Sequence, residues 1–462
     1  MSFASALEDI VDAGIPSALQ QFGSILDANW IHGALKETGT AAVRRRKLPA
    51  DVAVWVIIGM ALFRDCAIRT VVSHLGLVLP SGKKAKKQND KSIASSSVSE
   101  SRERLGEEPM RLIFQRSAEV WSAPAADGDR WRGRSLWGLD GSTLRVEDSE
   151  ANEAAFARPG TGRAASGYPQ VRLVALMAVR SHMLRSAAFG PCKGKKTGEQ
   201  ELARQLWDDV PDDAVVLMDR NFINYAVFYQ LTHDDQGVRR ARDWVTRAKS
   251  NLKWKTLKKL GPGDELVELT FSSSARKKNP TLPKTMQARA IRYQFKGFRP
   301  EVLLTSLLDP VEYPADEIIP LYHERWETEL GYDELKTDLL ERKEALRSRT
   351  PTGVRQEIWG LLLTYNLVRQ KMTEVADHVD LAPTRISFKN SLHVIRGFCY
   401  AHALSPSPGT LPKALQELEH MLAVLVLPER RPERHYERHV KIKMSSYKRN
   451  RGRQIADNSP ES

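Results

Sequence analysis

Apolar positions recur at helical spacing through the first 125 residues of the chain. Three segments carry this period, at 10–26, 49–63 and 68–79. They predict a helical N-terminal region, residues 1–125. A further helix predicted at 95–105 opens with small hydroxyl residues, among them Ser97 and Ser99. Hydroxyl groups at a helix N-terminus can bond DNA phosphates and approach base edges, or they can simply cap the helix. DNA binding and capping are therefore both open for this segment.

From residue 126 the apolar runs become short and alternate as in β-strands. The predicted elements are, in chain order, a strand at 135–146, an antiparallel pair at 171–179 and 182–189, a helix at 198–208 and a strand at 214–218. The first strand delivers Asp140 into a Gly-Ser turn, and the last strand ends at Asp219. An Asp-Gly pair is also common in plain turns, and an aspartate after a strand often caps the next helix. The order of the elements nevertheless matches a ribonuclease-H-like α/β core.

A polar stripe runs along one predicted helix nearer the C-terminus. At about 100° per residue, Tyr322, Arg325 and Lys336 fall within about 40° of Glu329, between two apolar borders. A carboxylate on such a face costs free energy unless it meets a partner, a metal ion or a substrate. The simplest partner is Arg325, since an i,i+4 ion pair stabilises a helix by about 0.2–0.5 kcal/mol. Three other glutamates are predicted on the back of the helix: Glu324, Glu327 and Glu334.

The spacing Y-x2-R-x3-E-x6-K, from Tyr322 to Lys336, resembles the signature of bacterial DDE transposases of the insertion sequence 4 family. The resemblance implies that Glu329 is the third metal-binding carboxylate of a catalytic site, after Asp140 and Asp219. It further implies cut-and-paste transposition through hairpin-ended intermediates. A homodimer that bridges both ends of the element is expected on the same ground.

The three acidic residues also suit metal chemistry by their type and order. Asp140 and Asp219 are 79 residues apart, and Glu329 follows 110 residues later. Hard oxygen ligands without His or Cys select Mg²⁺ or Mn²⁺. Two ions about 3.5–4 Å apart can activate a water or a 3′-hydroxyl and stabilise the leaving oxygen. A covalent route through Ser142 or Tyr322 is disfavoured, because no activating base lies near either residue in the sequence.

Phosphate contacts beside the scissile bond are expected from Tyr322, Arg325 and Lys336. Residues 247–259 form a second candidate DNA contact, with six positive charges and no acid. Lys253, Trp254 and Lys255 lie in this run. The resemblance implies that an aromatic side chain stacks on a flipped base, and Trp254 and Phe298 are the candidates. For each of them, an ordinary place in the core is the alternative.

The chain divides into three predicted regions. A catalytic core at 126–385 contains a β-rich insertion at about 239–308, and a helical, basic C-terminal region follows at 386–462. The segment 429–453 carries ten Lys and Arg against three Glu, and the whole chain has a net charge of +13. This balance indicates a polyanionic partner, and a solvated tail of this composition would still bind phosphates.

The remaining composition excludes several classes of protein. Three cysteines stand apart in the sequence: Cys66, Cys192 and Cys399. They indicate neither a disulfide framework nor a zinc site. The longest apolar run, 52–63, is too short to cross a bilayer, and the N-terminus lacks a basic signal-peptide segment. We expect a protein of the bacterial cytoplasm that has no contact with a membrane and that associates with the nucleoid when bound to DNA.

The predicted function is therefore that of a DNA transposase. It would cleave the ends of an insertion element with Mg²⁺ and join the 3′-hydroxyl to target DNA, so that its partner is double-stranded DNA. One alternative is a ribonuclease-H-like nuclease that cuts without strand transfer. The other is a DNA-binding protein derived from a transposase, with an inactive core.

Overall fold

The computed structural model describes most of the chain. The described residues are 19, 22–23, 25–41, 48–75, 95–123, 129–161, 164–165, 167–194, 197–234, 236–296, 298–341, 345–404 and 408–429. Most of the predicted helix at 10–26 lies outside these ranges. The basic segment at 81–89 and nearly all of the basic tail at 429–453 lie outside them as well.

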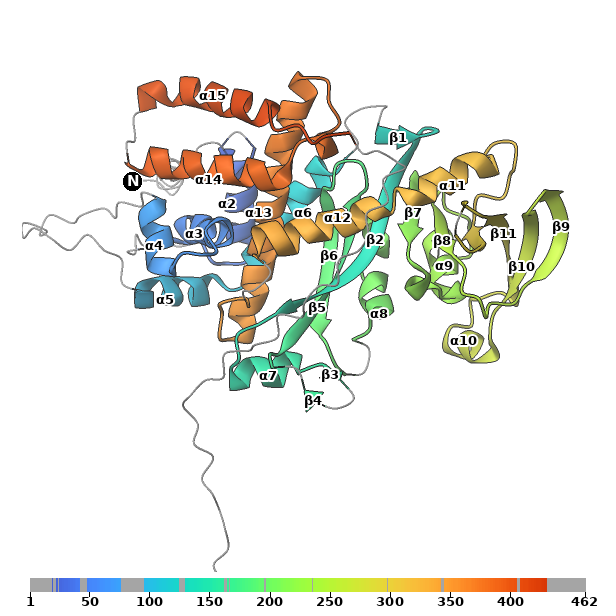
Figure 1. Ribbon diagram of the computed structural model, residues 1–462. Helices are drawn as coiled ribbons and strands as arrows, with labels where there is room; N and C mark the ends of the chain where they lie inside the picture. The colour runs from blue at the N-terminus through green and yellow to red at the C-terminus, as the bar shows by residue number, and fades with distance from the viewer. Residues whose placement is uncertain are drawn as a thin grey trace, which may run out of the picture.

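A ten-stranded mixed sheet organises the molecule, in the order β6-β5-β2-β7-β8-β12-β11-β10-β9, with β1 paired to β2 (Figure 1). Its core strands are β1 (Arg130–Trp131), β2 (Arg134–Arg145), β5 (Gln170–Ala178), β6 (Leu184–Pro191), β7 (Ala214–Met218) and β8 (Asp243–Arg247). Strand β2 runs antiparallel to β5 and parallel to β7, and β7 runs parallel to β8. This confirms the predicted α/β class and the predicted order of the first strand, the antiparallel pair and the next strand.

The two faces of the core sheet are covered by different helices. Alternate side chains of β2 and β7 point to one face or the other, as the strand period requires. On one face, residues such as Leu139 and Val216 pack with α8 (Glu199–Arg204) and α9 (Tyr225–Thr232). The opposite face carries α11 (Ala315–His323) and α12 (Trp326–Asp333), which run across it in Figure 1.

The N-terminal and C-terminal helices pack around one long central helix, α13 (Pro351–His378). Most of its residues are buried, from Val354 to Ala376. The surrounding helices are α2 (Ala28–Glu37), α3 (Ala50–Leu62), α4 (Ile68–His74), α5 (Ser95–Leu105), α6 (Glu108–Trp121), α14 (Phe388–Leu404) and α15 (Leu411–Ala423). The short helix α7 (Glu150–Phe156) and the hairpin β3 (Gly160–Thr161) and β4 (Ala164–Ala165) follow β2. None of the described helices is long and apolar enough to cross a membrane.

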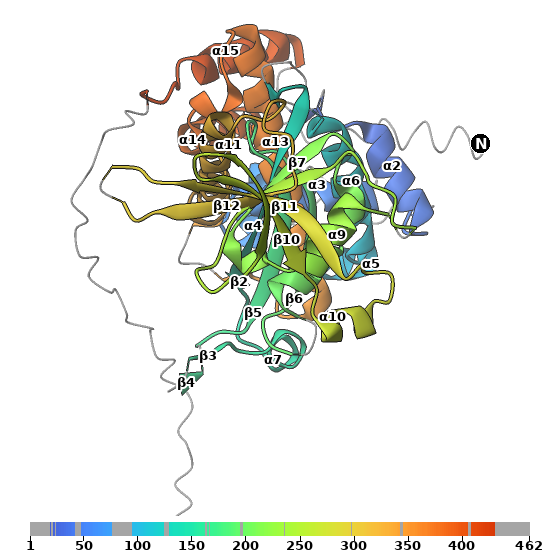
Figure 2. The ribbon, with the colours of Figure 1, turned by 90° about the vertical axis from the view of Figure 1, so that its right-hand side faces the viewer.

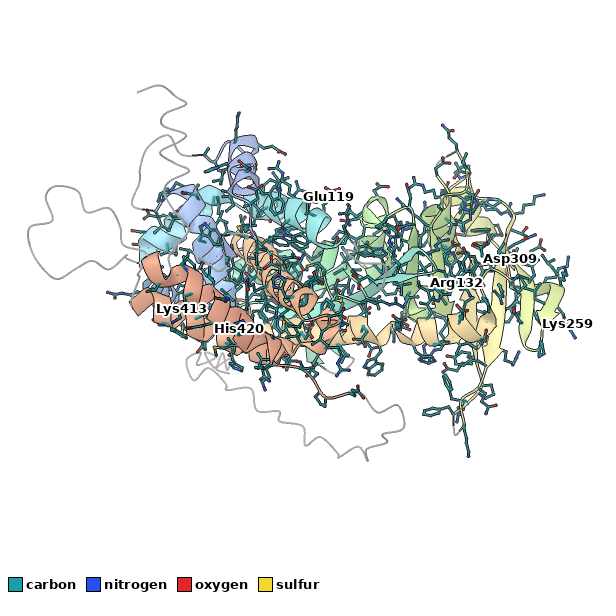
Figure 3. All side chains as sticks on the ribbon, turned by 90° about the horizontal axis from the view of Figure 1, so that it is seen from above. Glu119, Arg132, Lys259, Asp309, Lys413 and His420 are labelled. Atoms are coloured by element: carbon teal, nitrogen blue, oxygen red, sulfur yellow. The ribbon has the colours of Figure 1, made fainter. Side chains whose placement is uncertain are left out.

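Beyond β8 the sheet continues into the region where a β-rich insertion is predicted. Its strands are β9 (Lys255–Gly261), β10 (Asp264–Thr270), β11 (Thr285–Tyr293) and β12 (Glu301–Thr305), with α10 (Ser273–Lys278) between β10 and β11. Figure 2 looks onto this end of the molecule. Strand β12 pairs with β8, so these strands extend the core sheet rather than form a separate one. Lys259 of the outer strand and Lys413 of α15 mark opposite ends of the molecule in Figure 3.

Two predicted local features are wrong. Asp140 does not enter a Gly-Ser turn, because β2 continues through Gly141 to Arg145 and pairs with β5 along that length. The stripe at 322–336 does not lie on one continuous α-helix either. The α-helix is interrupted at Glu324 and Arg325, between α11 and α12. A π-helical turn, Glu334–Leu339, follows α12. Such π-helical turns occur frequently at functional sites.

Candidate active site

Asp140 and Asp219 come together because their strands are neighbours. In the parallel pair of β2 and β7, Leu139 lies opposite Met218, and each aspartate is the next residue along its strand. Both aspartates follow residues whose side chains point to the α8 and α9 face, so both belong to the face of α11 and α12. Asp219 precedes a short 3₁₀ turn but makes no side-chain capping bond to it. Its carboxylate instead accepts a 3.3 Å bond from Asn221.

Glu329 reaches this face because α12 lies directly against the sheet. A Cβ atom on Gly138 of β2 would come 1.9 Å from Oγ1 of Thr328. A Cβ atom on Gly331 would come 2.6 Å from the side chain of Met177 on β5. Two glycines therefore let helix and sheet approach closely. The Tyr332 hydroxyl then donates a 2.8 Å hydrogen bond to the backbone carbonyl of Asp140.

Tyr322, in the last turn of α11, and Arg325, just before α12, lie beside the two aspartates. Arg325 donates from Nη2 to Oε1 of Glu329 at 2.6 Å, which is the i,i+4 pair predicted from the sequence. The Arg325 side chain is 15% exposed and the Glu329 side chain 37% exposed. The buried Tyr322 hydroxyl lies 3.4 Å from the carbonyl of Met218, the residue before Asp219. The ion pair between Arg325 and Glu329 thus lies at the site. Its presence neither requires nor excludes a catalytic role for the two residues.

Lys336 completes the set from the π-helical turn. Its Nζ atom donates to Oγ of Ser142 at 2.9 Å. Ser142 is two residues beyond Asp140 on β2, so both belong to the same face of the strand. The four signature residues and the two aspartates therefore gather on the carboxyl-end side of β2 and β7.

The site has more negative charge than its own cations neutralise. Burial, together with the neighbouring carboxylates Glu329 and Asp219, raises the pKa of Asp140 from 3.8 to about 6. The Gly141 N–H, at 2.7 Å, and the Arg325 guanidinium act in the opposite direction. Burial also raises the pKa of the Tyr322 hydroxyl. Groups whose pKa values are perturbed by burial and like charges are typical of functional sites.

The donor set fits a hard divalent cation, although the carboxylates are not drawn together around one point. Within the described residues, no three His, Cys, Asp or Glu side chains are grouped closely enough to hold a metal ion. Glu329 is engaged by Arg325 instead. Asp140 and Asp219 supply carboxylate oxygens on adjacent strands, and a bound cation would relieve the repulsion that raises the pKa of Asp140.

The other predicted DNA contacts lie apart from the aspartates. Lys253 and Lys255 are exposed, and Trp254 is partly buried against the core of the α8 and α9 face. Phe298 is 59% exposed in the segment between β11 and β12, and Phe295 of the same segment is 49% exposed. The ring of Phe295 lies 5.1 Å from that of His323, the residue after Tyr322. Trp326, the residue after Arg325, is also 57% exposed. Exposed aromatic rings near the signature residues are therefore found at Trp326 and in this segment, and not at Trp254.

Sequence reasoning missed the polar contacts on the back of α12. His182 and Arg369, from distant parts of the chain, bind glutamates there. No local pattern marks either residue, because both contacts span more than 30 residues and depend on the fold. The sequence did carry one signal, three glutamates on one side of a helix, but not the identity of their partners.

Comparison with known proteins identifies the family. The chain matches the insertion element 4 transposase N-terminal domain over residues 16–115 and the transposase DDE domain over residues 131–367. It is 36% identical to transposase InsG of insertion sequence element IS4 from Escherichia coli (strain K12), over 93% of each chain. InsZ of the same organism is 28% identical over 65% of this chain and 92% of its own length. A cryo-EM structure of a piggyBac transposase synaptic complex with hairpin DNA gives a TM-score of 0.42 at 12% identity, covering 91% of this chain and 87% of that chain.

The fold and the matched domain define a DDE transposase, an enzyme class that acts on DNA with divalent metal ions. Within that class, the chain belongs to the insertion element 4 family. The predicted family and the predicted DNA transposase activity are thereby confirmed.

Proposed function

We propose that Asp140, Asp219 and Glu329 are the metal ligands of this transposase. The observation that carries this proposal is the register of β2 and β7, which places the two aspartates side by side beneath the helix that bears Glu329. Carboxylates alone favour Mg²⁺ or Mn²⁺, and the proposal is two ions for each site. Bound there, the ions would activate a water or a 3′-hydroxyl and stabilise the leaving oxygen of a phosphodiester.

The remaining signature residues prepare the site for a DNA strand. Arg325 holds Oε1 of Glu329 at 2.6 Å, and the other carboxylate oxygen can bind a metal ion while this pair is in place. When the pair opens, the guanidinium has two parallel donors for a phosphate. Lys336 adds a positive charge beside Ser142, and Tyr322 adds a hydroxyl beside Asp219. A DNA strand that passes over the carboxyl ends of β2 and β7 would contact all of these groups.

Further DNA contacts follow from exposed basic and aromatic side chains. Lys253 and Lys255 are solvent-accessible and would meet the phosphate backbone of the element end. Phe295, whose ring lies near His323, and Phe298 both offer exposed rings, which are better suited to base stacking than the partly buried Trp254. Cleavage of element ends and strand transfer in a paired-end homodimer complete the proposal, on the family's precedent.

The test uses purified protein, Mg²⁺ and a plasmid that carries the ends of the element. Asp140→Ala, Asp219→Ala and Glu329→Ala should each abolish cleavage and leave gel-shift binding of the ends nearly intact, because the metal ions act on chemistry more than on affinity. Glu119→Ala is the matched control, since this exposed carboxylate lies on α6, away from the site (Figure 3). Cleavage at the wild-type rate in any of the three variants would remove that residue from the set of ligands. Cleavage without joined products in the wild type would favour a nuclease.

A further inference from the structure

The turn between β5 and β6 holds the back of α12. Arg180 of this turn donates two hydrogen bonds of 2.9 Å to the carboxylate of Glu324, which lies at the break between α11 and α12. His182 of the same turn brings Nε2 within 3.0 Å of Oε2 of Glu327. The back of the helix, predicted from the sequence only as the side away from the polar stripe, is therefore fixed to the sheet at two points.

A third contact follows on the other side of Glu329. Glu334, at the start of the π-helical turn, forms an ion pair with the fully buried Arg369 of α13 and accepts a 2.9 Å hydrogen bond from Tyr365. His182 Nδ1 lies 3.3 Å from the same carboxylate. The carboxylates two residues before and five residues after Glu329 thus converge on one imidazole, which is only 2% exposed.

The partners of His182 define which of its nitrogens carries the hydrogen. Arg369 Nη2 lies 2.8 Å from His182 Nδ1, and a guanidinium has only donors. Nδ1 therefore accepts from Arg369, and Nε2 donates to Glu327. The ring acts as one acceptor and one donor, a function that the amide of a glutamine can also supply.

The backbone of His182 does not explain why a histidine is present. Its φ is +60°, in the left-handed region that favours glycine. A glycine would make the turn with less strain, so the imidazole is retained against the backbone preference. Its bonds to Glu327 and to Arg369 are what the side chain adds.

We propose that His182 is a positioning residue that sets the place of the Glu329 carboxylate by holding the glutamates on either side of it, Glu327 directly and Glu334 through Arg369. This inference rests on the proposed function, because it requires Glu329 to be a metal ligand. Hydrogen-bond partners that orient metal ligands typically change metal affinity 10–100-fold when they are removed. The same scale of loss is expected here.

The experiment measures Mn²⁺ affinity by electron paramagnetic resonance on the full-length protein, below the unfolding transition of each variant. His182→Gly keeps the backbone preference and removes the ring, and it should weaken Mn²⁺ binding about tenfold or more. His182→Gln keeps one donor and one acceptor and should return the affinity to within about threefold of wild type. His182→Asn tolerates the same backbone, is too short to span both partners, and replaces the glycine variant if that variant does not fold.

Arg132→Gly is the matched control. Arg132 also lies in a turn, has a φ of +50° and binds the same helical region through Glu317 of α11, at 2.7 and 2.5 Å (Figure 3). It should leave Mn²⁺ affinity unchanged, because it touches neither neighbour of Glu329. Wild-type affinity in the His182 loss variants, or an equal loss in Arg132→Gly, would overturn the proposal. Failure of the proposed function would appear separately, as unchanged Mn²⁺ affinity in Glu329→Gln.

Discussion

Two partly buried carboxylates, Asp140 on β2 and Glu334 just after α12, differ in the sign of their pKa shift. Burial and the neighbouring Glu329 raise the pKa of Asp140 to about 6, despite the opposing charge of Arg325. Burial also acts to raise the pKa of Glu334, but the Arg369 guanidinium outweighs it and holds that pKa at about 2. Burial acts to raise both pKa values: it prevails at Asp140, and the buried guanidinium of Arg369 outweighs it at Glu334.

The two carboxylates belong to clusters that differ in charge balance. The cluster around Glu334 is complete, because its charges are balanced, and the cluster around Asp140 is incomplete. Around Glu334, the protein supplies its own cation and hydrogen-bond donors, and the carboxylate is stable in its charged form. Around Asp140, three carboxylates face two cations: Arg325, which is already paired with Glu329, and Lys336, which binds Ser142. The first cluster fixes the structure, and the second retains an excess of negative charge that a divalent cation would neutralise.

The largest effect on stability is expected from breaking the complete cluster. Arg369→Met leaves Glu334 buried without its cation and should lower the free energy of unfolding by about 3–5 kcal/mol. Adding Glu334→Gln should restore much of that loss, because the buried charge is then gone as well. Urea unfolding of the two variants measures both changes.

An exposed pair provides the control for this prediction. Arg116 and Glu37 have side chains 31% and 57% exposed, so Arg116→Met should cost no more than about 1 kcal/mol. If Arg369→Met cost no more than Arg116→Met, the cluster around Glu334 would not be a structural anchor.

A smaller effect of opposite sign is expected at the incomplete cluster. Because the folded-state pKa of Asp140 is raised from 3.8 to about 6, the charged form is penalised above pH about 6 and the penalty disappears below about pH 4. Asp140→Asn should therefore stabilise the metal-free protein at pH 8, by about 1–3 kcal/mol, since one pKa unit corresponds to about 1.4 kcal/mol. The gain should shrink between pH 6 and 4, as followed by urea unfolding in the presence of a chelator. An Asn variant that is less stable than wild type at pH 8 would contradict the charge imbalance.

The sequence predicts the parts of this site that depend on local periodicity. The strands that lead to Asp140 and Asp219 and the turn near Arg180 follow from short apolar runs and the residues that interrupt them. The prediction of a Gly-Ser turn after Asp140 is wrong, because pairing with β5 overrides the turn preference of that dipeptide.

The features that the sequence does not predict come from packing between distant segments. The helix breaks at Glu324, and its π-helical turn begins at Glu334, each at a glutamate bound to another element. From the sequence, Glu327→Ala is expected to be mild, since that residue is placed on the back of the helix. Its bond to His182, 145 residues away, gives it a part in holding α12.

The smallest effect on stability, with a large effect on function, is expected at Arg325. Losing an i,i+4 ion pair should change the free energy of unfolding by a few tenths of a kcal/mol, so Arg325→Ala should unfold much like wild type. Lys413→Ala, which removes the exposed i,i+4 pair with Glu417 on α15, is the matched control for this loss. Arg325→Lys keeps the charge and loses the planar fork. If the guanidinium binds a phosphate with two hydrogen bonds, Arg325→Lys should impair paired-end assembly or cleavage while Lys413→Ala leaves both unchanged. Wild-type cleavage by Arg325→Lys would remove the bidentate role, and Arg325 would then serve only to neutralise Glu329 until a metal ion replaces it.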